Sequence, residues 1–233
     1  MIRNKKILIT GGSSGLGKSL ALKLANNNNK VFCIGRSSIK NKNISSVICN
    51  FNNLKEIKKK LKVLLKVKKL DYVFLNAGIL GDIKNIYEIK FKELLQILKI
   101  NVMANKEILD FIIKEKIKVR LIIGISSGAA LSPKIGWYLY CYSKSAFKFL
   151  IESYALEDRQ RKYINISPGL IKTKMQTKIC KVNEKKIPSV KKFKMLNRNN
   201  KVPSPDDVAD NLIDKIKKLK KFESGTYIDI RRK

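Results

Sequence analysis

The stretch that decides the fold is Lys5-Lys6-Ile7-Leu8-Ile9-Thr10-Gly11-Gly12-Ser13-Ser14-Gly15-Leu16-Gly17, close to the amino terminus. Its apolar half predicts a buried strand over 5–10, and helical spacing follows over 15–25. Glycines in the turn between them let the backbone approach a phosphate closely, and the start of the helix offers free N–H groups. The spacing is G-x3-G-x-G rather than G-x-G-x-x-G, so a flexible glycine turn is the competing interpretation of this segment alone.

Short apolar runs alternate with amphipathic stretches along the rest of the chain. The further predicted strands cover 30–34, 46–49, 71–75, 119–125, 164–167 and 226–230, and the further predicted helices cover 54–67, 88–116, 140–161 and 205–220. Strands that alternate with helices of this length imply a parallel sheet covered on both faces. No repeat or linker interrupts the 233 residues. We therefore predict an α/β fold, with one doubly wound domain over 1–233 and a seven-stranded parallel sheet.

The chain contains no histidine. Ser-His-Asp triads, Cys-His pairs and HExxH zinc sites are therefore excluded, and acid–base chemistry must come from Tyr, Lys, Asp, Glu or Cys. The cysteines lack CxxC spacing, which favours reduced thiols over disulfides or a metal site; they are Cys33, Cys49, Cys141 and Cys180. No apolar run approaches the roughly 20 residues that span a bilayer. We expect a cytoplasmic protein without a metal site or a membrane association.

The formal net charge of +33 raises the alternative of a polyanion-binding protein. Only eight of the 51 basic residues are arginine, however, and the chain is also rich in Asn, as at 26–29. Proteins that recognise nucleic acids usually favour Arg for bidentate contacts. The lysine excess is therefore better explained by a compositional bias than by a specific nucleic-acid partner.

Further motifs follow the other predicted strands or lie in the predicted helices. They are Asn76-Ala77-Gly78, Asn101, Ser126-Ser127-Gly128, Tyr140-x-x-x-Lys144, which begins 13 residues after Ser127, and Pro168-Gly169 with Thr173. Doubly wound sheets bind their ligands at the carboxyl ends of the strands, where most of these motifs fall. With the motifs in this order, the chain resembles the short-chain dehydrogenase/reductase family over essentially its whole length. The resemblance implies a Rossmann fold and an NAD(P)-dependent oxidoreductase that acts on CH–OH or C=O groups.

The resemblance also implies four catalytic residues. Tyr140 would donate a proton to a carbonyl oxygen, and Ser127 would hydrogen-bond that oxygen. Lys144 lies one helical turn after Tyr140 on the same face, where its charge would lower the phenol pKa, and in the family it also binds the nicotinamide ribose. Asn101 would hold a water that relays protons. The competing interpretation of Tyr140 is aromatic packing, because Tyr138 and Tyr142 flank it.

The end of the second strand bears on the choice of cofactor. Sites that prefer NAD place a carboxylate there for the ribose 2′-hydroxyl, whereas an Arg accommodates a 2′-phosphate. Here Gly35 stands at that position and Arg36 follows, which favours NADP(H) over NAD(H). Asn50 matches the family position that faces the adenine. The resemblance assigns further cofactor contacts to Gly11, Ser13, Ser14, Gly15, Leu16, Gly17, Asn76, Ala77, Gly78, Tyr140, Lys144, Pro168, Gly169 and Thr173.

Segments 75–82, 136–141, 168–176 and 224–229 are similar to the sepiapterin reductase and benzil reductase branch of the family. This similarity assigns substrate contacts to Trp137, Met175 and Asp229. Asp229 matches a carboxylate that anchors a pterin ring, and a solvated surface acid is the alternative. Lys172 and Lys174 depart from the branch. The lysine-rich segment 177–200 stands where the family has its substrate lid, so it is either a solvated mobile loop or a selector of anionic substrates.

These observations predict an NADPH-dependent reductase of a small ketone, a dicarbonyl or a pterin side chain. The alternatives are a dinucleotide-binding regulator without turnover and, less favoured, a polyanion-binding protein. The helices that begin near Glu88 and Tyr140 pair in two-fold dimers of the family, and the second carries more apolar residues than one sheet-covering face needs. We therefore expect a homodimer.

Overall fold

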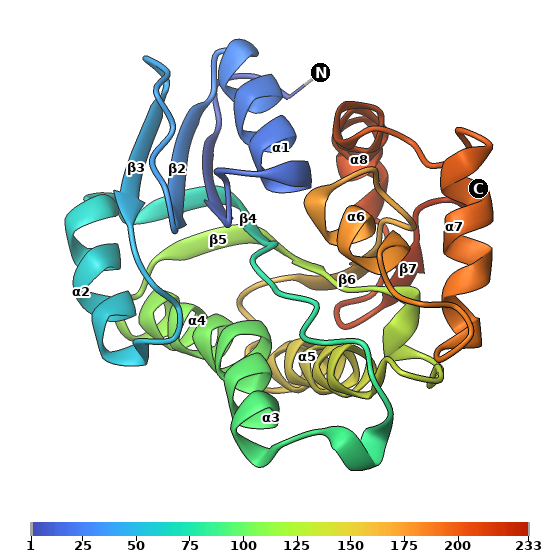
Figure 1. Ribbon diagram of the computed structural model, residues 1–233. Coiled ribbons are helices and arrows are strands. Elements are labelled where there is room, and N and C mark those ends of the chain that lie inside the picture. Colours follow the sequence, from blue (N-terminus) through green and yellow to red (C-terminus); the bar gives the residue numbers. More distant parts are fainter. Residues whose placement is uncertain (1, 233) are drawn as a thin grey trace.

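The computed structural model describes residues 2–232 and contains one seven-stranded sheet (Figure 1). All neighbouring strands pair in parallel, in the order β3-β2-β1-β4-β5-β6-β7. The strands are β1 (Lys6–Thr10), β2 (Lys30–Gly35), β3 (Ile44–Ile48), β4 (Lys69–Leu75), β5 (Lys118–Ile125), β6 (Tyr163–Ser167) and β7 (Tyr227–Asp229). The predicted doubly wound sheet is confirmed, and the strand boundaries move by at most two residues.

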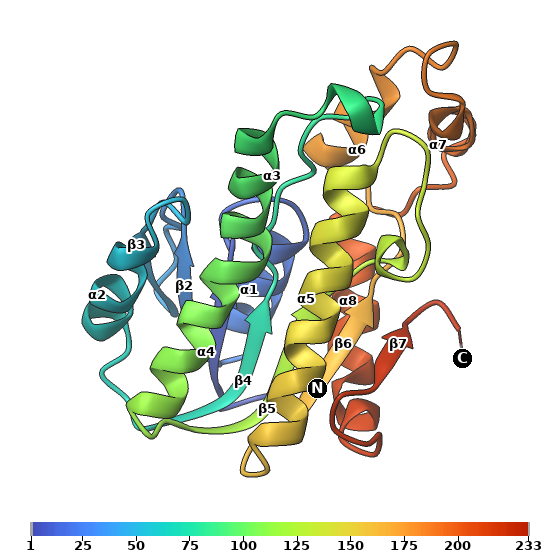
Figure 2. The same ribbon diagram turned by 90° about the horizontal axis from the view of Figure 1, so that it is seen from below.

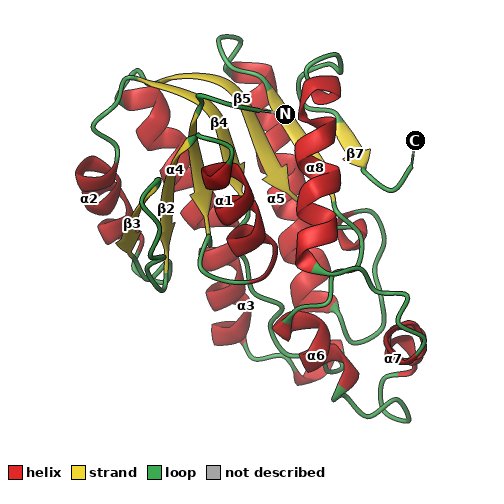
Figure 3. Cartoon of the chain, turned by 90° about the horizontal axis from the view of Figure 1, so that it is seen from above, coloured by secondary structure: helices red, strands yellow, loops and turns green. Residues whose placement is uncertain are grey.

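Helices cover both faces of the sheet (Figures 1 and 3). One face packs against α1 (Gly15–Asn26) and α8 (Pro205–Leu219), and the other against α2 (Leu54–Leu64), α4 (Ala104–Lys114) and α5 (Tyr138–Glu157). Each central strand is therefore buried on both sides, which explains its continuous run of apolar residues. All strands run the same way, so their carboxyl ends form a single edge.

The predicted helix over 88–116 is interrupted. A short 3-10 turn (η1, Ile86–Glu88) precedes α3 (Phe91–Leu98), and a π-helical turn (η2, Lys99–Met103) separates α3 from α4. A π turn inserts one extra residue into a helix and often marks a functional position. Here it contains the buried Asn101, whose side chain bonds the backbone of the β4 loop instead of facing solvent.

Segment 177–200 is folded, although its lysine content predicted an irregular loop. It contains the end of α6 (Lys174–Cys180), a 3-10 turn (η4, Pro188–Val190) and α7 (Lys191–Arg198). Both helices lie beyond the carboxyl ends of the strands (Figure 2). The segment packs on a third, small apolar cluster at that edge, through Ile179, Ile187 and Val190. Apolar residues spaced between the lysines hold the segment to the rest of the fold.

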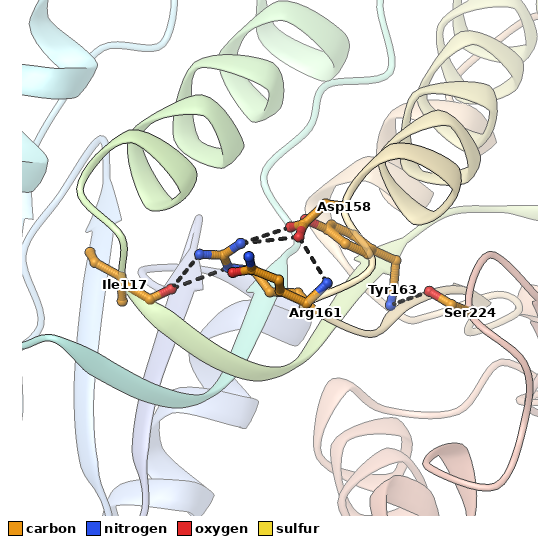
Figure 4. Close-up of polar contacts among 6 residues, drawn as sticks. Ile117, Asp158, Arg161, Tyr163 and Ser224 are labelled. Atoms are coloured by element: carbon orange, nitrogen blue, oxygen red, sulfur yellow. Dashed lines mark hydrogen bonds and ion pairs between the residues drawn. The ribbon is translucent and has the colours of Figure 1, made fainter.

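A buried ion pair between Arg161 and Asp158 lies at the opposite, amino-terminal edge of the sheet (Figure 4). Arg161, in the turn between α5 and β6, contacts both carboxylate oxygens of Asp158 at 3.1 and 3.0 Å. The same guanidinium donates from Nε and Nη2 to the Ile117 carbonyl oxygen, at 3.2 and 2.9 Å. The Tyr163 hydroxyl donates to Asp158 at 2.5 Å. This cluster fastens the turn that precedes β6 to the loop that precedes β5.

Candidate active site

The glycine turn between β1 and α1 is shaped for close backbone contacts. Gly11 has a φ of +67°, which an L side chain rarely adopts. A Cβ at Gly17 would lie 2.3 Å from the Gly11 carbonyl oxygen, so the turn folds tightly onto the first turn of the helix. No acidic residue stands in the first turn of α1, and Ser14 caps it without a side-chain hydrogen bond. Its N–H groups are therefore available to an anionic ligand.

The motif after β4 is bonded directly to this turn. The Asn76 side chain donates to the carbonyl oxygen of Thr10 at 3.0 Å and, more weakly, to that of Gly11 at 3.4 Å. The backbone N–H groups of Asn76 and Ala77 both donate to Thr10 Oγ1 at 2.9 Å. The buried Thr10 thus fixes two motifs together, and sequence reasoning missed it. Its place as the last residue of β1, beside the first glycine, is the signal that could have identified it.

Two residues assigned to cofactor binding stand at the ends of β2 and β3. Arg36 follows β2 directly and is exposed, and no other residue within 2–232 bonds its guanidinium. Asn50 is also exposed, and its side-chain oxygen accepts a hydrogen bond from the Asn52 N–H at 3.1 Å. Its amide NH2 therefore remains the group that can reach a ligand.

Ser127, Tyr140 and Lys144 meet at the carboxyl end of β5. Ser127 follows the strand and caps a 3-10 turn (η3, Gly128–Ala130). Tyr140 and Lys144 lie one turn apart in α5, with Lys144 Nζ 5.9 Å from the centre of the Tyr140 ring. Lys144 Nζ donates to the Ile125 carbonyl oxygen at 2.8 Å. The structure therefore brings these three predicted residues together.

Burial dominates the titration of this group. It raises the pKa of Tyr140 to about 12, and the Ser127 hydroxyl opposes the shift only in part. Burial also lowers the pKa of Lys144 to about 8. The pKa of Tyr140 is therefore raised and not lowered as expected from Lys144, because the low-dielectric site penalises both charged forms. A Tyr140 that is fully protonated at neutral pH is the state that a proton donor requires.

Asn101 stands beside this group and is fully bonded through its side chain. Its Oδ1 accepts from the Ile79 N–H at 2.8 Å, and its Nδ2 donates to the Ile79 carbonyl and to Ser143 Oγ, each at 2.9 Å. A Cβ on Gly78 would lie 3.3 Å from Asn101 Oδ1 and 3.7 Å from Lys144 Nζ, so only glycine fits between them comfortably. Ser143 was not predicted, although it directly precedes Lys144.

The loop after β6 returns to the glycine turn. Pro168 is buried, and Gly169 has a φ of +80° with the Arg231 side chain lying across it. Thr173 caps α6, and its methyl group would lie 3.2 Å from a Cβ on Gly15. The segments predicted to bind the cofactor after β1, β4 and β6 therefore lie next to one another at the carboxyl edge of the sheet.

Two predicted substrate residues belong to the small apolar cluster under 177–200. Trp137 stacks on Phe193 with ring centres 4.8 Å apart, meets Tyr140 edge-on at 6.3 Å, and donates from Nε1 to Ser189 Oγ at 3.0 Å. Met175 is half-buried in the same cluster. Trp137 thus links the lysine-rich segment to the proton donor.

Asp229, the third predicted substrate residue, forms an ion pair with Arg231. The Arg231 backbone N–H and Nε donate to its Oδ1 at 3.1 and 2.8 Å, and Arg231 Nη2 bonds its Oδ2. The Arg231 guanidinium holds the pKa of this carboxyl below its usual range. Its side chain is only 14% exposed. Asp229 is therefore neither a solvated surface acid nor a free acceptor for a ligand.

These residues fit a nicotinamide dinucleotide. The tightly folded glycine turn and the free helix N-terminus suit a diphosphate, and an exposed cation stands at the end of β2. Gly78, Tyr140 and Lys144 lie together at the carboxyl edge of the sheet, where doubly wound folds bind their ligands.

Residues 5–184 match the family model described as short chain dehydrogenase. The chain therefore belongs to the short-chain dehydrogenase/reductase family and is an enzyme of that class. Benzil reductase ((S)-benzoin forming) of Bacillus subtilis (strain 168) is 27% identical over 96% of this chain and 97% of its own length. The chain lies in the branch that contains this reductase.

Solved structures agree with the fold. A short-chain dehydrogenase/reductase from Saccharomyces cerevisiae superposes with a TM-score of 0.88 at 24% identity, over 97% of this chain and 96% of that one. A structure described as ElxO with NADP bound has a TM-score of 0.77 at 26% identity, over 97% of both chains. Within residues 2–232, no helix is both long and apolar enough to cross a membrane.

Proposed function

We propose that this enzyme is an NADPH-dependent carbonyl reductase in which Tyr140 is the proton donor. The observation that carries the proposal is the Tyr140 phenol, half-buried beside Ser127 and Lys144, with a pKa raised to about 12. A group that stays protonated at neutral pH donates its proton only when a stronger base forms next to it. The alkoxide produced by carbonyl reduction is such a base.

Each side chain then has one task. The bound nicotinamide supplies the hydride. Ser127 hydrogen-bonds the substrate oxygen, and Tyr140 gives that oxygen its proton. Lys144 stabilises the phenolate that Tyr140 becomes, because its cationic charge is nearby in a site of low dielectric. A regulator without turnover would not need this donor, so the arrangement favours an enzyme over that alternative.

NADP(H) is the proposed cofactor. Arg36 is exposed directly after β2, where its guanidinium would bond a 2′-phosphate, and Gly35 adds no carboxylate that would repel the phosphate. A relative of the same fold has been solved with NADP bound, which supports the assignment. A +33 chain also attracts anionic ligands at long range.

The proposed substrate is a small ketone or dicarbonyl. The Bacillus subtilis relative is named for the reduction of benzil, a dicarbonyl. A pterin side chain is less favoured, because Arg231 already occupies the Asp229 carboxylate that would bind the pterin ring. We further propose that 177–200 is the substrate lid, since its Phe193 stacks on Trp137, which contacts Tyr140. We also propose that the enzyme works in the cytoplasm, where its cysteines stay reduced.

Replacement of the donor tests the proposal. Tyr140→Phe keeps the ring and removes the hydroxyl, so kcat for NADPH-dependent diketone reduction should fall by about 10² or more while NADPH still binds. Tyr142→Phe, an exposed position on the same helix, is the matched control and should reduce diketones like the parent. A Tyr140→Phe variant with normal turnover would show that another group is the donor.

A further inference from the structure

The loop between β6 and α6 is held in place mainly by packing. Within residues 2–232, the backbone of 168–171 makes no hydrogen bond. The first one in the loop runs from the Lys172 N–H to the Pro203 carbonyl oxygen, at 2.9 Å. Because backbone hydrogen bonds do not fix 168–171, the side chains that pack against this segment determine its conformation.

The Arg231 side chain packs directly on Gly169, in the middle of this segment. A Cβ at Gly169 would lie 2.6 Å from Arg231 Cδ, 3.1 Å from Nε and 3.4 Å from Cγ. Apart from the residues on either side of the glycine, no atom of the described chain lies closer to that position. The aliphatic part of the arginine therefore occupies the space that a side chain at 169 would need.

Asp229 fixes the charged end of the same arginine. Its Oδ1 accepts from the Arg231 backbone N–H and from Nε, and its Oδ2 bonds Nη2. A carboxylate that binds a guanidinium through both oxygens restricts its rotation. The Asp229 side chain is mostly buried, so solvent screens this ion pair less than one on the open surface. The stem of Arg231 is thus held over Gly169 at both ends.

The backbone that carries this pair is anchored to the core. Ile230, between the two charged residues, is 1% exposed and belongs to the apolar cluster that α1 and α8 cover. Its N–H donates to the Ser167 carbonyl oxygen at 3.1 Å, and its carbonyl oxygen accepts from Lys215 Nζ of α8. Arg231 therefore extends from a fixed point at the end of β7 onto the loop after β6.

The loop connects two parts of the candidate active site. At its start, β6 lies beside β5, and the Ser126 N–H donates to a carbonyl oxygen of β6 at 2.7 Å. Ser127 of the candidate catalytic group follows directly. At its end, the Thr173 methyl group would lie 3.2 Å from a Cβ on Gly15, in the glycine turn that suits a diphosphate. Segment 168–173 therefore runs along the part of a dinucleotide between its diphosphate and its reacting carbon, which is the nicotinamide half.

We propose that Arg231 is a positioning residue for the cofactor. Its side chain, fixed by Asp229, packs on Gly169 and holds 168–173 in the conformation that binds the nicotinamide half. The proposal rests on the proposed function, in which this cofactor is NADPH. It gives Asp229 a task other than the substrate contact that the sequence predicted, because its carboxylate acts on the cofactor through Arg231 and the loop.

The contact with the loop is tested first in the protein without cofactor. Hydrogen exchange at the Lys172 amide measures how often the loop opens, and in Arg231→Ala it should be faster by about fivefold or more. Arg232→Ala removes the neighbouring exposed cation and is the matched control, which should exchange like the parent. Equal exchange in the parent and in Arg231→Ala would overturn the proposal.

Cofactor binding is then measured with two ligands. NADPH carries both halves of the dinucleotide, whereas adenosine 2′,5′-bisphosphate carries only the half with the 2′-phosphate. Arg231→Ala should raise the Kd of NADPH about tenfold and change the Kd of the bisphosphate by less than about twofold, because a preordered loop lowers the cost of binding only for the ligand that it contacts. Arg231→Lys keeps an aliphatic stem and a cation for Asp229, so it should regain part of the NADPH affinity.

A double variant separates positioning from charge. Arg231→Ala alone leaves the Asp229 carboxylate without its cation, and that charge would repel an anionic cofactor. Asp229→Asn combined with Arg231→Ala removes both charges and still lacks the arginine stem. Its Kd for NADPH should therefore stay close to that of Arg231→Ala. A double variant that binds NADPH like the parent would overturn the positioning role, since repulsion would then explain the loss.

The two ligands also distinguish this proposal from the proposed function. Equal weakening of NADPH and the bisphosphate in Arg231→Ala would show that the arginine supports the fold in general, which contradicts the proposal. A parent protein that binds neither ligand would refute the proposed function. Faster hydrogen exchange in Arg231→Ala would then still establish the contact between Arg231 and the loop.

Discussion

The buried Lys144 lowers the stability of the folded protein and places an ionisable group in the candidate active site. Lys144 is 5% exposed, and its ammonium group has only the Ile125 carbonyl as a hydrogen-bond partner within the described chain. Burial lowers its pKa from 10.5 to about 8, so in the folded protein the charged form is disfavoured. Tyr140, one turn away, is kept neutral by the same burial. Both groups are held against their preferred solvation so that they can act on a ligand.

Lys144→Met should stabilise the cofactor-free protein. Below pH 8 the lysine is charged in both the folded and unfolded states, and its burial costs the folded state about 3 kcal/mol. Between pH 8 and 10.5 the unfolded chain binds the extra proton, so the stability of the parent rises with pH and the advantage of the variant shrinks. Urea unfolding at pH 7 and pH 10 measures this difference.

Lys148→Met is the matched control, since Lys148 makes a half-exposed ion pair with Glu152 and should change stability by less than about 1 kcal/mol. A Lys144→Met protein that is less stable than the parent at pH 7 would contradict the electrostatic explanation. It would show that the hydrogen bond to Ile125 outweighs the cost of burying the charge.

Arg36 is the residue on which the choice of cofactor depends. If its guanidinium bonds the 2′-phosphate, Arg36→Ala should weaken NADPH binding by about 1.5–3 kcal/mol and leave NADH binding nearly unchanged. Lys40→Ala removes a nearby exposed cation and is the control. Fluorescence titration with both cofactors gives the comparison. An equal loss of affinity for NADPH and NADH would mean that Arg36 only supports the loop after β2.

At the scale of elements, the parts that could be predicted from the sequence are those decided locally. Each strand is a short apolar run followed by a glycine or polar motif, and parallel strands carry such motifs to one edge. This is why Asn76, Ser127 and Pro168 could be placed before the structure was known. Helical spacing predicted that Tyr140 and Lys144 share one face, and their catalytic roles came from the resemblance to the family.

The remaining features depend on contacts between distant segments. The π turn at 99–103 contains Asn101, whose side chain bonds Ile79, 22 residues earlier in the chain. The folding of 177–200 depends on Trp137, which stacks on Phe193. Asp229 is a different case, because its partner Arg231 is only two residues away. A turn at the end of β7 brings the two together, and the alternation of a strand predicts them on the same face without showing that they bond.

The ion pair at the amino-terminal edge provides a test at this scale. Arg161→Ala would leave the Asp158 carboxylate, which is 11% exposed, without its cation. The loss should destabilise the protein by about 3–5 kcal/mol in urea unfolding, as expected when one partner of a buried pair is removed. Tyr163→Phe removes only one hydrogen bond to the same carboxylate and should cost about half as much. Similar small losses in both variants would indicate that water replaces the guanidinium.

Considered as a whole, the molecule leaves one helical surface only partly covered. Helices α3 and α4 follow one another end to end, and α5 lies alongside them on the outside of the sheet (Figure 2). Phe91, Phe149 and Leu156 on these helices are 72%, 71% and 67% exposed, and Tyr142, Leu95 and Met103 are each more than 40% exposed. Apolar side chains gathered on neighbouring helices indicate an interaction surface. We expect a second copy of the chain to cover it, because family members form two-fold dimers through the helices that correspond here to α3 with α4 and to α5.

Phe149→Glu should therefore dissociate the protein. In a two-fold dimer the same surface is used by both copies, so one substitution places two buried carboxylates in the interface and removes two aromatic side chains. Sedimentation at micromolar concentration should give a species of twice the 26.6 kDa chain mass for the parent and a single-chain species for the variant. Val63→Glu, an equally polar change at a 61%-exposed residue of α2, should leave the dimer intact because α2 lies away from α3 and α5. A parent protein that sediments as the 26.6 kDa species would refute the dimer, and the exposed surface of α3, α4 and α5 would then need a different partner.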